Sequence, residues 1–184
     1  MLQFFRSRRL CLLALALACS APAFAADKKP SRLKEYITER VTISGAVENK
    51  LSLSVDDLRK FPLHRVGEAN LICQSGAEME KLKNIVGVRL TDILEKAKII
   101  ALEHNDPKKM IVVASASDGY KVVFSWTELF NSSLGEGVIV FFERDGAPLN
   151  DVEGRLAMVS VHDTRTGPRH VRWLKDIEVI KIAQ

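Results

Sequence analysis

The stretch KMIVVASASDGYKVVFSW, residues 109–126, gives the clearest structural signal in this sequence of 184 residues. Apolar residues alternate with small or polar ones on both sides of Ser117-Asp118-Gly119, a triplet of turn-forming residues. Alternation with a period of two is typical of strands that bury one face, and Asp-Gly favours a tight turn. The stretch therefore predicts a β-hairpin, and Trp126 is expected to open a short helix after its second strand.

Similar patterns on both sides of this hairpin predict further strands. The strand-like segments are ERVTISGAV, HRVGEANLIC, GVIVFFERDGAPL, RLAMVSVHD and DIEVIKIA, in this order along the chain. Two segments indicate short helices instead: VDDLRKF, with Ser54 as its cap, and GVRLTDILEKAKI, with Thr91 as its cap. Short helices scattered among many strands, without regular helical crossovers, predict an α+β fold with a mostly antiparallel or mixed sheet.

The first 25 residues have the composition of an export signal. Three arginines precede an apolar run of ten residues, and Ala23-Phe24-Ala25 forms an A-x-A cleavage pattern. We predict secretion, to the periplasm if the source is a Gram-negative bacterium, a mobile leader over residues 26–37 and a single domain over residues 38–184. The twin-arginine route and a lipid anchor on Cys19 remain alternatives. No later apolar segment is long enough to span a bilayer, so the mature chain is expected to lack a membrane span.

Removal of this signal would change both the cysteine count and the charge. Cys11 and Cys19 would leave with it, so Cys73 would be the single cysteine and could form no intramolecular disulfide. Without three of its 27 basic residues, the chain would nearly balance its 23 acidic ones. A net charge close to zero argues against nucleic acid as a partner.

The order of motifs along the chain resembles the molybdopterin-binding domain of the sulfite oxidase family. These motifs are a cysteine at a strand end, GVRLTDILEKA, SASDGYKVVFSWTEL, FFERDGAPL and EGRLAMVSVHDTRTGPRHVRWLKDIEV. The resemblance covers residues 41–183 and implies a fold of mixed β-sheets and short helices with a cofactor cleft. In the enzymes of that family the matching cysteine binds molybdenum, so the resemblance implies this role for Cys73. A soft thiolate suits such a redox-active metal.

The chain also departs from those enzymes. Segment GVRL follows Cys73 within 14 residues, which leaves little room for a loop around the cofactor, and Ala157 stands where the family often has an arginine. In size, export signal and single-domain form the chain is similar to small secreted pterin-binding regulators of the same superfamily. This resemblance implies a periplasmic protein that binds a free reduced pterin and signals to a membrane-bound cyclic-di-GMP enzyme, as in biofilm regulation. The alternative is a molybdenum-cofactor-dependent oxidoreductase with Cys73 as the metal ligand.

Three segments are expected to close around a pterin. Its flat ring favours an aromatic wall, its amino-pyrimidine edge a carboxylate acceptor, and its polyol a hydroxyl, amide or guanidinium partner. The candidate ligand-binding residues are Cys73, Gln74, Ser75, Ser115, Ser117, Asp118, Tyr120, Trp126, His162, Arg165, Arg169, Arg172 and Trp173. Several have ordinary alternatives: turn formation for Asp118, core packing for the tryptophans, and a solvated loop for residues 162–173. No residue is predicted to be catalytic, because the chain lacks hydrolase, phosphate-loop and zinc motifs.

Overall fold

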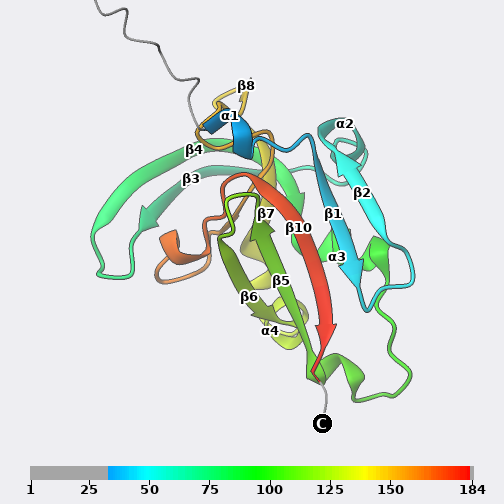
Figure 1. Ribbon diagram of the computed structural model, residues 1–184. Coiled ribbons are helices and arrows are strands. Elements are labelled where there is room, and N and C mark those ends of the chain that lie inside the picture. The colour runs from blue at the N-terminus through cyan, green and yellow to red at the C-terminus, as the bar shows by residue number, and fades with distance from the viewer. Residues whose placement is uncertain (1–32, 183–184) are drawn as a thin grey trace, which may run out of the picture.

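The computed structural model describes residues 33–182, and strands make up most of its regular structure (Figure 1). The strands are β1 (Arg40–Gly45), β2 (Leu51–Ser54), β3 (His64–Ile72), β4 (Glu78–Arg89), β5 (Met110–Ala116), β6 (Lys121–Ser125), β7 (Val138–Arg144), β8 (Ala147–Pro148), β9 (Ala157–Ser160) and β10 (Leu174–Lys181). The helices are α1 (Leu33–Tyr36), α2 (Val55–Leu58), α3 (Leu90–Ala97) and α4 (Trp126–Phe130), with 3-10 turns η1 (Asp106–Lys109), η2 (Gly135–Gly137) and η3 (Gly167–Arg169).

These strands form two sheets of five. One has the order β2-β1-β10-β5-β6, and the other has β3-β4-β7-β8 with β9 paired to β7. Strands β1 and β10 run parallel, whereas β1 with β2 and β5 with both β6 and β10 run antiparallel. The mixed sheets and short helices confirm the α+β class expected from the sequence.

The hairpin predicted from residues 109–126 is present as β5 and β6, with Ile111 opposite Ser125. Helix α4 begins at Trp126 as expected, and the hydroxyl of Ser125 caps it by accepting a hydrogen bond from the Glu128 N–H at 3.1 Å. Ser54 caps α2 in the same way. The cap predicted at Thr91 is wrong, because the N-cap is Arg89, two residues earlier, and α3 begins at Leu90, directly after the end of β4. Leu90 is fully buried, so its core contact sets where the chain turns into the helix.

The N-terminal predictions meet the structure only in part. Residues 1–25 and most of the expected leader lie outside the described residues. The end of that leader forms α1, and the ring of Tyr36 lies 5.4 Å from the ring of Trp173. Thr38 then donates to the Leu174 carbonyl at 2.9 Å. Residues 33–37 of the expected leader thus contact the domain, whereas its mobility stays a prediction. Among the described residues no helix is long and apolar enough to cross a membrane.

Two buried clusters support this architecture. The larger cluster joins the inner face of the first sheet to the apolar face of α3. The smaller one lies in the second sheet, around Leu82, Phe141 and Val159. From this second sheet the long β3–β4 hairpin curves outward, and the segment around η3 lies under its free end (Figure 1). This arrangement sets the hairpin turn, the η3 segment and the β5–β6 turn close together.

Candidate functional site

The three segments that the sequence predicted to converge do meet, at a cavity of about 370 Å³ that we call the central cavity. The end of the β3–β4 hairpin, the β5–β6 turn and the η3 segment each contribute to its wall. The lining residues are Leu71, Met79, Glu80, Asp118, Tyr120, Gly167, His170, Arg172 and Trp173. A cavity of this size, with apolar walls and a few polar groups, is typical of small-molecule sites.

Hydrogen bonds hold the three segments against one another. The buried hydroxyl of Thr166 donates to the Asn70 carbonyl at 2.5 Å and accepts from the Ile72 N–H at 2.9 Å. On the other side, the Tyr120 hydroxyl donates to the Pro168 carbonyl at 2.6 Å. One threonine therefore fixes the η3 segment to the strand that leads to Cys73.

Thr166→Val is expected to destabilise the chain by about 2 kcal/mol, because it keeps the volume but leaves two backbone groups of β3 without their side-chain partner. Chemical denaturation should measure the loss. Amide hydrogen exchange should show faster exchange at residues 70–77 than in the wild type. Thr166→Ser, which keeps the hydroxyl, is the matched control and should change both readouts much less. Equal exchange in the valine variant and the wild type would show that this contact does not order the hairpin end.

Trp173 provides an aromatic wall in an unusual backbone conformation. Its φ is +48°, a region that bulky residues rarely adopt without surrounding support. Its indole Nε1 donates to the Asp151 carbonyl at 2.9 Å, its N–H to Glu153 at 2.8 Å, and its carbonyl accepts from Ser117 at 3.0 Å. Gly154 leaves room for it, since a Cβ there would lie 2.8 Å from Trp173 Cδ1. The structure thus fixes the position of this ring from several sides.

Cys73 lies in the turn between β3 and β4, beside the central cavity rather than in its wall. A Cβ added to the cavity residue Gly167 would lie 3.4 Å from Cys73 Cα, so the two backbones touch. The thiol is half-buried, and the Ser75 hydroxyl lies 2.7 Å from its Sγ. This hydroxyl, together with the Ser75 N–H at 3.3 Å, lowers the pKa of Cys73. Such a thiol is a better metal ligand than an ordinary buried cysteine.

A network of charged side chains forms one side of the central cavity. The buried carboxylate of Glu153 lies 2.9 Å from His170 Nε2 and 3.5 Å from Arg172 Nε. Burial by itself raises the pKa of Glu153, but the hydrogen bond and charge of His170, with the charges of Arg172 and Arg144, outweigh it and lower the pKa. Glu80 continues the network at 2.7 Å from Arg144 Nη1 and 3.7 Å from Arg172 Nη2.

A second hollow, the side cavity, lies on the other side of this network and has a volume of about 460 Å³. It shares Glu80 with the central cavity, and its other lining residues are Arg144, Asp145, Ala147, Pro148, Leu149, Asn150 and Glu153. The two cavities are thus neighbours across one set of ion pairs.

Four of the predicted site residues lie at the central cavity: Asp118, Tyr120, Arg172 and Trp173. Cys73 lies beside it, with Gln74 and Ser75 exposed in the same turn. The guanidinium of Arg165 rests over that turn, since its Nη2 would lie 3.1 Å from a Cβ at Gly76. The β3–β4 turn and the η3 segment therefore approach each other as the sequence predicted.

Ser115 and Ser117 are corrected, because their side chains do not line the central cavity. Both line a separate hollow on the first sheet, together with Ser44 and Lys175. The strand alternation sets this placement: Ala114 and Ala116 face the buried side, so the serines between and after them face outward. The Ser117 hydroxyl instead donates to the Tyr36 carbonyl.

Trp126 and His162 are also corrected. Trp126 stacks on Phe130, with ring centroids 4.1 Å apart, and packs against the larger buried cluster. It belongs to α4 and therefore has the packing role that was its ordinary alternative. The ring of His162 lies against Gly137, and its Nδ1 is 2.7 Å from the Ser133 carbonyl. The sequence motif around His162 is continuous, but its side chains point to different parts of the domain.

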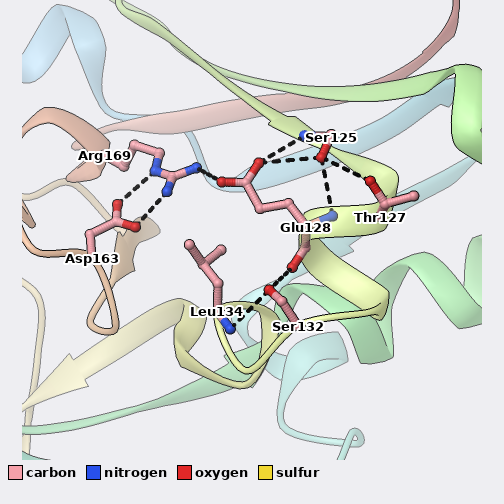
Figure 2. A network of polar contacts seen from close by, with 7 residues as sticks. All are labelled: Ser125, Thr127, Glu128, Ser132, Leu134, Asp163 and Arg169. Carbon is pink, nitrogen blue, oxygen red and sulfur yellow. Dashed lines mark hydrogen bonds and ion pairs between the residues drawn. The ribbon is translucent and has the colours of Figure 1, made fainter.

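Arg169 is corrected from a ligand-binding to a structural role (Figure 2). Its guanidinium forms a bidentate pair with Asp163 and lies 2.7 Å from Glu128 Oε1. Glu128 is in turn bonded to Ser125 at the start of α4. The same guanidinium lies 4.5 Å from the centroid of Phe124. Asp163 and Glu128 both pair with Arg169, so its charge is neutralised. The pair with Glu128 connects the η3 segment to α4.

Four polar or charged members of the site were not among the predicted ligand-binding residues: Glu80, Arg144, Glu153 and His170. His170 was noticed among the basic residues of the polar segment, but it was not chosen as a ligand-binding candidate. Glu80 belongs to β4, no part of which was predicted to be a strand; its last three residues were expected in the helix that follows. Alternation in EMEKLK was an available signal for that strand, although it does not indicate which arginine would meet Glu80.

A protein family and a solved structure are similar to this chain in sequence and in fold, respectively. Residues 30–184 match the family model described as the oxidoreductase molybdopterin binding domain. The chain belongs to this family. Its fold is similar to that of the sulfane dehydrogenase SoxCD from Paracoccus pantotrophus, with a TM-score of 0.57 and 21% sequence identity. The match covers 77% of this chain and 38% of the SoxCD chain, and at this identity it concerns the fold alone. Among curated proteins, none matches the sequence.

Because the chain belongs to this family, a molybdopterin is the cofactor that the residues at the central cavity would have to fit. Among residues 33–182, no group of three or more His, Cys, Asp or Glu side chains is placed to hold a metal ion. Cys73 can supply one soft thiolate ligand, which is the donor type that the resemblance implies. Trp173 and Leu71 offer apolar walls for a ring, and Asp118 and Glu80 offer acceptors. The residues present therefore fit the ring and the metal-binding end of the cofactor.

Proposed function

We propose that the chain is an oxidoreductase module that holds a molybdopterin cofactor beside the central cavity, with Cys73 as the thiolate ligand of the metal. The position of Cys73 supports this proposal most directly. Its thiol is half-buried, has a lowered pKa and lies in backbone contact with Gly167 of the cavity. When bound, the cofactor supplies the oxygen or electron transfer, whereas the protein supplies position and electrostatics.

The remaining residues have separate tasks in this proposal. Trp173 and Leu71 bind the faces of the ring system, and the carboxylate of Asp118 accepts from its amino-pyrimidine edge. The hydroxyl and N–H of Ser75 stabilise the thiolate form of Cys73, which is the form that binds a metal. Arg165, which rests over the same turn, supplies a cation for the phosphate of the cofactor.

A second candidate is the periplasmic regulator that binds a free reduced pterin and signals to a membrane-bound cyclic-di-GMP enzyme. Two observations favour it. The β3–β4 turn spans residues 73–77, which leaves no long loop there to wrap a larger cofactor. Ala157, where the family often has an arginine, is fully buried in β9 opposite Phe141. Each observation suits a ligand without phosphate and metal.

Metal and pterin content distinguish the two candidates. The full chain is purified from a host grown with molybdate, molybdenum is measured by mass spectrometry, and pterins are extracted, oxidised and quantified by fluorescence. The oxidoreductase proposal expects molybdenum and pterin in equal, stoichiometric amounts. Pterin without metal would overturn it in favour of the regulator. Absence of both from protein that also fails to bind added pterin would overturn both candidates.

A further inference from the structure

Among residues 33–182, Glu80 alone lines both the central and the side cavity. Its two carboxylate oxygens face two different guanidinium groups. Oε1 lies 2.7 Å from Arg144 Nη1, and Oε2 lies 3.7 Å from Arg172 Nη2. The arginine at each cavity is thus already paired with a carboxylate of the protein.

Glu153 adds a second carboxylate to the same arginine. It lies 3.5 Å from Arg172 Nε and is only 4% exposed in its side chain. His170 and the two arginines hold its pKa below the ordinary value against the effect of burial, so Glu153 carries its charge at neutral pH. The ionised carboxylate of Glu153 lies inside the wall, where little water screens its negative charge. Its charge therefore acts on groups in both cavities.

The balance of charges at each cavity follows from these contacts. Among the residues that the structure describes, the side cavity has three carboxylates, those of Glu80, Asp145 and Glu153, and one guanidinium, that of Arg144. The central cavity has Glu80 and Asp118 against Arg172, with His170 engaged by Glu153. Neither wall offers an excess of positive charge. An anion that enters would have to displace a carboxylate from its arginine.

We propose that Glu80 makes this pair of cavities selective for an uncharged or cationic guest and against small oxyanions such as sulfate, sulfite and phosphate. The inference rests on the proposed function in one respect only, namely that a small molecule binds at these cavities. It concerns the free ligand, or the substrate that occupies the space beside the cofactor ring, whereas the cofactor phosphate is assigned to Arg165, which lines neither cavity. If the chain is an oxidoreductase, its substrate is therefore a neutral or positively charged compound.

Glu80→Gln tests this directly, because it removes the negative charge that faces Arg144 at one cavity and Arg172 at the other. The Glu80 side chain is 40% exposed, so the variant should fold, which thermal unfolding checks. Binding of sodium sulfate and sodium phosphate is measured by the fluorescence of Trp173, in a Trp126→Phe background where it is the only tryptophan. The variant is expected to bind sulfate at least about tenfold more tightly than the wild type at low salt.

Glu78→Gln is the matched control, because Glu78 is an exposed residue of β4 two positions earlier and its loss changes the net charge equally. It should leave sulfate binding weak. Sulfate binding by the wild type that is as tight as in Glu80→Gln would overturn the inference, as would an equal gain in the control. Failure of the proposed function is recognised separately, since it shows as absence of metal and pterin from the wild type whatever the sulfate affinities are.

Discussion

Cys73→Ser is expected to reduce the molybdenum in the purified chain from stoichiometric to background. Serine has nearly the same shape, but its hydroxyl stays protonated at neutral pH and is a poor ligand for a soft metal. Cys73 is half-buried in a turn and belongs to neither of the two buried clusters, so the melting temperature should change by no more than about 2 °C. Mass spectrometry for the metal and calorimetry for the fold measure the two effects on one preparation.

Ser75→Ala gives a graded control for the same site. It removes the hydroxyl 2.7 Å from Cys73 Sγ and so should raise the pKa of the thiol toward its ordinary value. The rate at which iodoacetamide alkylates Cys73 should therefore begin to increase at a higher pH than in the wild type. The purified variant should also contain less molybdenum than the wild type. Full molybdenum in Cys73→Ser would rule out the thiolate as the ligand. Retained pterin binding without metal in either protein would favour the regulator.

The fold was largely predictable because its signals are local. Apolar alternation around the Ser117-Asp118-Gly119 turn gives β5 and β6, and the Ser54–Asp57 spacing gives the capping box of α2. The start of α3 was misplaced because two requirements compete there. Thr91 has the side chain of a cap, but burial of Leu90 brings the preceding residue into the helix. Tertiary packing, which local propensity does not contain, decides that boundary.

The site was predictable only in part because its selective groups are defined by distant partners. The sequence itself indicates Asp118, which stands in a Ser-Asp-Gly turn, and Trp173, which follows a segment rich in basic residues. Glu80, in contrast, meets Arg144 from 64 positions away, and nothing in either segment indicates the other. The same limit misled the interpretation of Arg169, which is a free cation in the sequence but pairs with Glu128 from 41 positions away in the structure. Charge in a sequence thus indicates candidates, whereas pairing decides which of them remain available to a ligand.

Glu153→Gln is expected to be among the most destabilising single changes in the chain. The substitution keeps the shape but removes the carboxylate charge beside His170 and Arg172, leaving their side chains near a neutral amide. Loss of one partner from a buried ion pair costs about 3–5 kcal/mol. For a domain of this size that corresponds to a fall in melting temperature of about 10 °C. Asp151→Asn, a charge removal on an exposed side chain two residues away, is the control and should change stability by less than about 0.5 kcal/mol.

The pH dependence of this difference identifies its electrostatic origin. The pKa of Glu153 is lower in the folded chain than its ordinary value of 4.5, so folding favours the ionised form. The stabilisation from ionised Glu153 is therefore complete above pH 4.5 and is lost as the pH falls through the lower, folded-state pKa. Urea denaturation of wild type and Glu153→Gln should show a wide gap in unfolding free energy at pH 7 and a narrower one at pH 3.5. A gap of equal width at both pH values would assign the loss to packing, since packing does not titrate, and would remove Glu153 as a fixed negative charge of the two cavities.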